Sequence, residues 1–328
     1  MSFSRTVKEE LARVAPDKPC CRRAELAGLI RSAGTLEIQA VASGATPESG
    51  RLFIWVETGQ APVARKLVLL AKSVLGVAPE VLVRRQRRLR RTRSFGIHLV
   101  PSNPMADLVR LGVLAPDGGL QRAIPEDLVS HNGCRRSYLR GLFLGSGSIT
   151  DPGRGHHLEI VLRDESLADA AGQILFGFGI PVRISARRGE LVLYLKESEQ
   201  IGNLLRLMGA HQALLAYENV LAMKTVKNRV NRLVNAETAN LEKSVDAGVR
   251  QAEDVKLIRR RLGLHALTPS LRELAGLRLK HPGASLKELG EMCVPPLGKS
   301  GVAHRLRRIE TLAGDLRGET DRTSKRSR

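Results

Sequence analysis

The sequence predicts an α+β fold in which two halves share one plan, followed by a helical connector and a small all-helical C-terminal domain. Three observations lead to this prediction. The first is an order of elements that occurs twice: apolar helix, hairpin, helix, hairpin, helix. The second is a long polar, helix-compatible stretch after Ala213. The third is a set of short apolar helix patterns near the C-terminus, separated by turn residues.

The first half covers residues 1–113. Apolar residues recur at three- and four-residue spacing in its helical segments and alternate in its strands. The predicted helices cover residues 3–14, 20–33, 62–74 and 103–111, and the predicted strands cover 36–41, 52–57, 80–89 and 94–100.

The second half, residues 114–220, starts the order again after a loop at 115–119. Its predicted helices cover 135–144, 165–176 and 199–208, and its strands cover 157–163, 182–186 and 191–195. Because self-similarity of this kind sets the whole architecture, we interpret it as an internal duplication.

The remaining chain divides into a helical connector at 221–262, a compact domain at 263–316 and a tail at 317–328. We expect Asn231, Asn235 and Asn240 to cap helix junctions in the connector, with phosphate contacts by neighbouring basic residues as the alternative. The tail is charged and has no aliphatic residue after Leu316, which predicts a disordered basic segment.

Composition favours a polyanionic partner. The 328 residues carry a formal net charge of +20, and residues 221–328 hold 23 Lys and Arg against 12 Asp and Glu. Such a charge favours binding to phosphates, although a generally basic proteome is the alternative. Aromatic residues make up only 3%, which argues against a protein that stacks single-stranded bases on aromatic side chains.

The four cysteines do not form a C-x-x-C pair, so neither a zinc site nor a redox motif is expected, and Cys20 and Cys21 are interpreted as helix-packing residues. We predict no metal and no cofactor. The N-terminus lacks an apolar signal region, and no apolar run is long enough to cross a bilayer. These features predict a cytoplasmic protein with no membrane partner.

The C-terminal domain has the pattern of a helix-turn-helix. An apolar helical stripe at 270–280 ends at His281-Pro282-Gly283, and Ser285 with Glu288 forms a capping box for the next helix. A Pro-Pro turn precedes a third helix from about Ser300 to Leu312. On that helix Val302, Leu306 and Ile309 form an apolar stripe, and polar and basic residues form the other face.

A recognition helix needs this division, because one face is held by a partner helix while the other reaches base edges or phosphates. The predicted DNA-binding residues are Ser285, Lys287, Lys299, Ser300, His304, Arg305, Arg307 and Arg308. The alternative is a helical protein-binding domain whose basic face is solvated.

Two segments resemble the LAGLIDADG motif of homing endonucleases: Leu26–Gly34 and Leu139–Gly147. The resemblance implies two helices that pack through small residues, each offering a carboxylate to a divalent metal that assists phosphodiester cleavage. Here Ala33 and Ser146 occupy the catalytic acid positions, and Arg31 would add positive charge near the metal. Neither Ala nor neutral Ser replaces a carboxylate ligand, so we predict no catalytic residues and no enzyme activity. Plain apolar core helices are the alternative interpretation.

A basic run at 84–93 falls in a predicted hairpin, where Arg87, Arg88 and Arg90 are candidates for a second DNA contact. The alternative, which we weigh equally, is that the run forms a solvated strand face or a loop, since charge runs are usually solvated.

Taken together, the chain resembles the WhiA family of bacterial regulators. The resemblance rests on strings at 2–11, 20–28, 138–143, 231–241, 284–290 and 299–309. It departs at Ala303, where relatives are expected to have Asn. The resemblance implies a duplicated LAGLIDADG-endonuclease-like N-terminal domain and a C-terminal helix-turn-helix, which bind double-stranded DNA in the nucleoid. It also implies transcription regulation linked to sporulation, cell division and chromosome segregation.

Three functional hypotheses follow: a transcription regulator, an active nuclease, and a nucleoid-anchored scaffold whose N-terminal domain binds a protein partner such as a second transcription regulator. Loss of both acids at Ala33 and Ser146 opposes the nuclease. The third helix and the charge favour the regulator.

Overall fold

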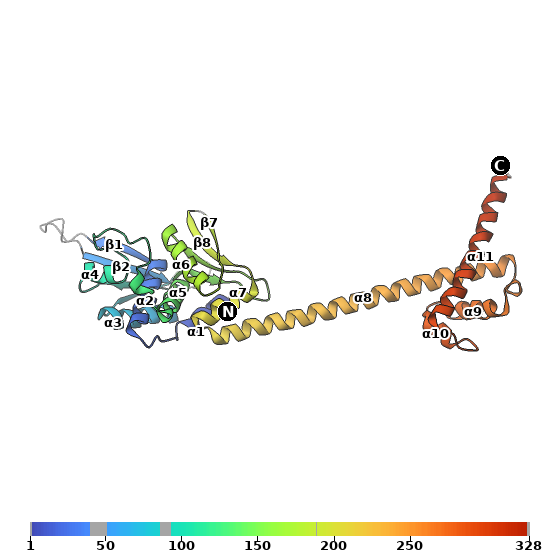
Figure 1. Ribbon diagram of the computed structural model, residues 1–328, viewed down its shortest axis with the longest axis horizontal. Coiled ribbons are helices and arrows are strands. Elements are labelled where there is room, and N and C mark those ends of the chain that lie inside the picture. Colours follow the sequence, from blue (N-terminus) through green and yellow to red (C-terminus); the bar gives the residue numbers. More distant parts are fainter. Residues whose placement is uncertain (1, 40–50, 86–92, 188, 327–328) are drawn as a thin grey trace. The chain divides into compact units, whose positions relative to one another are not determined.

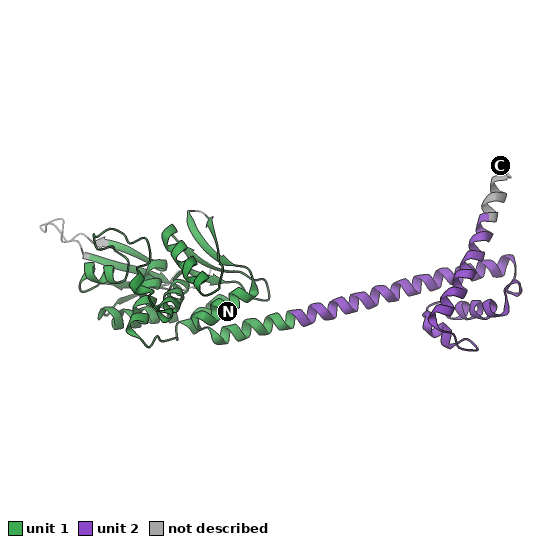
Figure 2. Cartoon of the chain, in the orientation of Figure 1, with its two compact units in different colours: residues 1–224 green, residues 225–328 purple. Residues whose placement is uncertain are grey.

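The structure is a computed structural model that describes residues 2–39, 51–85, 93–187 and 189–326 (Figure 1). The chain divides into two compact units, Met1–Lys224 and Thr225–Arg328 (Figure 2). The first contains both predicted halves, and the second contains the C-terminal helices.

Each half of the first unit contains a four-stranded antiparallel sheet. The first sheet has the order β1-β2-β4-β3, with β1 Gly34–Gln39, β2 Arg51–Thr58, β3 Glu80–Arg85 and β4 Arg93–Leu99. The second has the equivalent order β5-β6-β8-β7, with β5 Gly147–Ile149, β6 Leu158–Leu162, β7 Arg183–Arg187 and β8 Glu190–Leu195. The shared strand order confirms the α+β duplication. The short strand β5 was not predicted, because three residues are too few to show alternation.

The helices of the first unit are α1 Phe3–Leu11, α2 Pro19–Ala33, α3 Ala61–Leu75, α4 Pro104–Arg110, α5 Asn132–Ser146, α6 Glu165–Gly177 and α7 Ser198–Met208, with a short 3₁₀ turn at Glu126–Leu128. In each half one helix packs on the inner strands: α3 contacts β4, and α6 contacts β8. Alternation places Leu158, Ile160 and Leu162 of β6 in the core while Glu159 and Val161 are only half-buried. One continuous apolar core therefore joins both halves.

Helices α2 and α5 lie side by side at the centre of the first unit (Figure 1). Their backbones approach so closely that a Cβ atom on Gly28 would overlap the carbonyl oxygen of Tyr138. A Cβ on Gly141 would likewise overlap the carbonyl oxygen of Glu25 and lie 2.8 Å from the Leu29 nitrogen. Only glycine permits this approach, because the opposing atoms are backbone and cannot rotate away.

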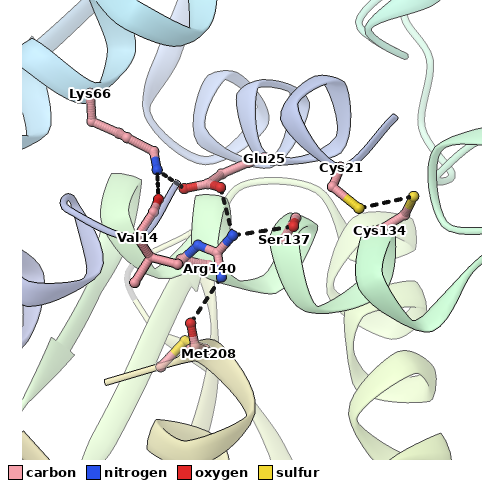
Figure 3. A network of polar contacts seen from close by, with 8 residues as sticks. All are labelled: Val14, Cys21, Glu25, Lys66, Cys134, Ser137, Arg140 and Met208. Atoms are coloured by element: carbon pink, nitrogen blue, oxygen red, sulfur yellow. Dashed lines mark hydrogen bonds and ion pairs between the residues drawn. The ribbon is translucent and has the colours of Figure 1, made fainter. Parts of the chain in front are cut away.

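A buried ion network holds the same two helices (Figure 3). The Glu25 carboxylate is fully buried and pairs with Arg140 at 2.7 Å and Lys66 at 3.0 Å. Arg140 also donates to the Met208 carbonyl at 3.0 Å, and Lys66 donates to the Val14 carbonyl. Burial lowers the pKa of Lys66, while the attraction of Glu25 opposes that shift. The network ties α2, α3, α5 and the end of α7 together, because an unpaired buried charge would be strongly destabilising.

Helix α8 runs without a break from His211 to Arg261, so residues 211–224 belong to the first unit and the rest to the second. The expectation that Asn231, Asn235 and Asn240 cap helix junctions is wrong, since the helix has no junction between those positions. All three side chains are exposed. The continuous helix is consistent with the lack of Pro and Gly between His211 and Ala247.

The second unit contains the C-terminal part of α8, a 3₁₀ turn at Leu264–Ala266, and the helices α9 Pro269–Lys280, α10 Leu286–Glu291 and α11 Lys299–Arg326. Its core joins Val255 and Ile258 of α8 to aliphatic residues of the other three helices. Arg278 is almost completely buried, and its guanidinium donates to the carbonyls of Pro282 at 3.2 Å and Ala284 at 2.6 Å. The α9–α10 turn is therefore fixed by a buried cation that donates to backbone carbonyls.

Helix α11 continues through Arg326, whereas the sequence predicted a disordered tail from residue 317. That prediction was wrong for 317–326, and residues 327–328 lie outside the described part of the chain. The last proline is Pro296, so no proline interrupts the helix. Arg317 also forms an ion pair with Asp254 of α8. In the described residues, no helix is both long and apolar enough to cross a membrane.

The close packing of α2 and α5 leads to a first prediction. Gly141→Ala forces a methyl group against the α2 backbone, so we expect the free energy of unfolding of the first unit to fall by about 1–3 kcal/mol. Urea unfolding followed by fluorescence reports on this unit alone, because Trp55 on β2 is the single tryptophan of the chain.

Gly172→Ala in α6 is the matched control. A Cβ there would lie 3.6 Å from Val182 Cγ2, an ordinary contact, so the variant should be neutral or more stable by up to about 1 kcal/mol. Equal stability of the Gly141→Ala and Gly172→Ala variants would show that the helices do not need this close approach.

Candidate nucleic-acid interface

The predicted capping box begins helix α10 and is confirmed. The Ser285 hydroxyl accepts a hydrogen bond from the Glu288 backbone N–H at 3.3 Å, and the Glu288 carboxylate accepts one from the Ser285 N–H at 2.7 Å. These hydrogen bonds lower the pKa of Glu288. The cap fixes where α10 starts, because it satisfies amides that have no partner within the helix.

The turn between α10 and α11 covers residues 292–298 and packs closely on α10. A Cβ atom on Gly290 would overlap the carbonyl oxygen of Leu297, so the turn requires glycine at this position. The Val294 N–H donates to the Glu273 carboxylate of α9 at 2.8 Å, and the Cys293 side chain is buried. These contacts set the position at which α11 begins.

The apolar stripe predicted on the third helix is confirmed. Val302, Leu306 and Ile309 are each at most 1% exposed and lie in the core of the second unit. The core position of these residues directs the intervening residues outward. The exposed residues of the opposite face are Lys299, Ser300, His304, Arg307 and Arg308.

The first turn of α11 contains no acidic residue. The positive end of the helix, together with the exposed Lys299 and Ser300, therefore presents donors and positive charge to solvent. A phosphate oxygen is the kind of acceptor that such a helix start binds. Residues 299–309 of α11 thus carry one apolar face and one basic face with hydrogen-bonding side chains.

The other three predicted contact residues are placed differently. The Ser285 hydroxyl already serves as the helix cap, and the half-buried Arg305 lies 3.5 Å from the Ser270 carbonyl of α9. Lys287 on α10 is strongly exposed, and its ammonium is 3.9 Å from the Glu291 carboxylate. Ala303 is half-buried and offers only a methyl group.

The basic run predicted as a second contact falls mostly outside the described part of the chain. Arg87, Arg88 and Arg90 lie outside the described residues. The neighbouring Arg84 of β3 is described, and its guanidinium lies over the ring of Trp55 at 5.5 Å from the ring centre.

The two positions that correspond to catalytic acids end the paired helices. Helix α2 ends at Ala33 and α5 at Ser146, and each is followed at once by a strand that begins with glycine. The Ser146 hydroxyl donates to the Leu142 carbonyl at 3.4 Å. Among the described residues, no Asp or Glu side chain belongs to a group of three or more potential metal ligands.

Arg31, near the end of α2, has backbone partners in the structure. Its guanidinium donates to backbone carbonyls of the segment that joins the two halves, among them Gly112 and Arg122, the latter at 2.6 Å. The guanidinium therefore holds that segment, and the effect of its charge on a metal ion stays a prediction.

Sequence reasoning missed a group of three thiols. Cys20 and Cys21 of α2 and Cys134 of α5 lie together, with all sulfur atoms within 4.8 Å of one another. The duplication could have predicted the meeting of Cys21 and Cys134. Cys21 stands at the same distance before Gly28 as Cys134 does before Gly141, so the two cysteines are equivalent positions of the two halves. Equivalent positions on two paired helices meet across their contact.

Comparison with known proteins agrees with this architecture. Three family models match in order: a WhiA N-terminal LAGLIDADG-like domain at 19–114, a WhiA LAGLIDADG-like domain at 135–227, and a WhiA C-terminal HTH domain at 230–313. A probable cell division protein WhiA of Symbiobacterium thermophilum is 48% identical over 318 residues, 96% of this chain and 98% of its own. The chain belongs to the WhiA family.

Two further relatives extend the likeness. The protein of the same name from Heliobacterium modesticaldum is 48% identical over 95% of this chain and 96% of its own. The crystal structure of full-length DUF199/WhiA from Thermatoga maritima matches with a TM-score of 0.58 and 27% identity, covering 96% of this chain and 99% of the other. The WhiA architecture of LAGLIDADG-like halves followed by a helix-turn-helix is thus the fold of this chain.

Proposed function

We propose that this WhiA chain is a sequence-specific double-stranded DNA-binding protein that regulates transcription through helix α11. The observation that carries the proposal is the division of that helix: Val302, Leu306 and Ile309 are buried, while His304, Arg307 and the helix start are exposed. An exposed Arg can donate to guanine O6 and N7, and His can make a single hydrogen bond to a base or a phosphate.

The charge of the second unit supports the same proposal. It contains no Phe, Trp or Tyr, so base stacking on aromatic rings is not available to it. Its recognition chemistry is instead made of basic side chains, hydroxyl groups and unshielded helix amides. These groups suit a DNA duplex, in which proteins recognise base edges by hydrogen bonds and contact phosphates through hydrogen bonds and positive charge.

The biological role in the proposal comes from the relatives. Curated relatives over nearly the full length are named probable cell division protein WhiA. We propose a role in cell division and chromosome segregation, and in sporulation where the organism forms spores, with the protein in the cytoplasm at the nucleoid. We further propose that the first unit has lost nuclease activity, since Ala33 and Ser146 stand at the ends of the helices that carry the acids in homing endonucleases.

A protein partner of the first unit is a second candidate. The edge strand β3 exposes three successive apolar side chains, Val81, Leu82 and Val83, each at least 45% exposed. An exposed apolar edge of this kind favours association. Under this second candidate function, the helix-turn-helix anchors the chain to DNA, and the first unit binds a protein partner, for example another transcription regulator.

The DNA-binding proposal predicts the behaviour of a His304→Ala, Arg307→Ala double variant. It should lose its preference for specific genomic fragments, including its own promoter region, by about 1–3 kcal/mol for each lost base contact. Fluorescence anisotropy at several salt concentrations measures both the preference and the salt slope.

Arg259→Ala, which removes an exposed charge from α8 in the same unit, is the control and should keep the preference. If wild type and double variant bind all fragments alike with the same steep salt slope, the recognition role fails and the scaffold is favoured.

Loss of nuclease activity has its own test. The purified chain should leave supercoiled plasmid intact in Mg²⁺ or Mn²⁺, because no carboxylate stands at residue 33 or 146. Metal-dependent cleavage that disappears in a Ser146→Ala variant would overturn this part of the proposal. Cleavage that persists in the variant identifies a contaminating nuclease.

A further inference from the structure

The thiols of Cys20, Cys21 and Cys134 form a compact group in the first unit. Cys20 and Cys21 lie in the first turn of α2, and Cys134 lies in the first turn of α5. Figure 3 shows the Cys21 and Cys134 side chains pointing toward each other. Their sulfur atoms are 3.8 Å apart, and the sulfurs of all three cysteines lie within 4.8 Å of one another. Cys21 and Cys134 are buried, and Cys20 is half-buried.

The spacing of the sulfurs fits one metal ion. A Zn²⁺ ion binds thiolate sulfur at about 2.3 Å, which places two sulfurs of a tetrahedral site about 3.8 Å apart. The observed distance between the Cys21 and Cys134 sulfurs agrees with this sulfur–sulfur distance. Gly133 allows the close approach, since a Cβ there would lie 3.2 Å from the Cys21 sulfur. Among the described residues, this is the one group of three His, Cys, Asp or Glu side chains positioned to share an ion.

The surroundings suit a negatively charged metal–thiolate group. Zn²⁺ with three thiolates has a net charge of −1. Neither α2 nor α5 has a side-chain cap or an acidic residue in its first turn, so two unshielded positive helix ends lie at the cysteines. Helix N-termini of this kind favour thiolates.

A cavity of about 980 Å³ borders the thiol group. Its lining includes Cys20 and Cys21 together with the basic side chains of Lys18, Arg136 and Arg206. The cavity brings further positive charge near the thiols and gives water or a small anion access to them. A three-ligand site needs that access, because tetrahedral zinc takes a fourth ligand.

We propose that Cys20, Cys21 and Cys134 form a three-thiolate site for a thiophilic divalent cation of the Zn²⁺ class, with the fourth position open to the adjoining cavity. The ion would join the starts of α2 and α5, at the opposite ends from Ala33 and Ser146. The site is independent of the DNA-binding proposal, because it lies wholly in the first unit.

The first test measures bound metal in the full-length chain. After exposure to Zn²⁺ under a phosphine reductant and dialysis against a weak chelator, the wild type should retain one zinc ion per chain by elemental analysis. Cys20→Ser and Cys134→Ser should each retain at least tenfold less. Cys293→Ser removes a buried thiol of the second unit and should retain zinc like the wild type.

A second measurement uses Co²⁺ in the unmodified chain, so that it does not depend on the folding of any variant. Co²⁺ bound by three thiolates gives a strong sulfur-to-metal charge-transfer band in the near ultraviolet and the visible bands of tetrahedral cobalt. Zinc should remove both sets of bands. Trp55 fluorescence shows whether the first unit of the Cys20→Ser and Cys134→Ser variants is folded.

The proposal is overturned if the reduced wild type retains no more zinc than Cys134→Ser and gives no charge-transfer band. It is also overturned if Cys293→Ser loses zinc as the other serine variants do. In either case the three thiols are packing residues of the α2–α5 contact.

Discussion

The direct backbone contact between α2 and α5 is the constraint on which the first unit depends. Gly28 and Gly141 have no room for a Cβ atom, so the two helix backbones can approach this closely only with glycine at these positions. That pairing places Glu25 within reach of Arg140 and Lys66, and it brings Cys21 next to Cys134. It also fixes where the helices end, at Ala33 and Ser146, and where β1 and β5 begin. The two sheets follow from those starting points.

The same constraint explains how the first unit can keep its architecture without acids at the helix ends. The apolar core needs no acid at either position, because Ala33 packs against it as a partly buried apolar residue and Ser146 is not part of it. The buried Glu25 network involves neither residue. Arg31 and Ser146 bond to backbone carbonyls. Different contacts order the second unit. Arg278 holds the α9–α10 turn, and the Ser285–Glu288 capping box fixes the start of α10, the helix that precedes α11. Its apolar stripe then orients a basic face toward solvent.

Much of this could be predicted from the sequence. Periodicity and the repeated order of elements predicted the α+β duplication, and the Ser285–Glu288 spacing predicted the cap of α10. Local patterns could not predict contacts between distant segments.

Charged residues usually lie at the surface, yet Glu25 is fully buried, where it pairs with one cation from α3 and one from α5. Cys20 and Cys21 were interpreted as helix-packing residues, and the lack of a C-x-x-C pair predicted no metal site. The approach of Cys134 to them depends on the pairing of α2 with α5, which no local pattern shows. The tail was predicted to be disordered from its lack of aliphatic residues, but the Arg317–Asp254 pair lies beyond any local pattern.

The most direct test of the central claim, that α11 is the DNA-reading element, is hydrogen exchange of the full chain with and without a DNA fragment that it binds selectively. The account predicts slower exchange on DNA in peptides that cover residues 299–308, because the helix start and the basic face become covered. Peptides of α9 and α10 that form the core should change less. Unchanged exchange at 299–308, with protection confined to residues 1–224, would contradict the account and assign DNA binding to the first unit.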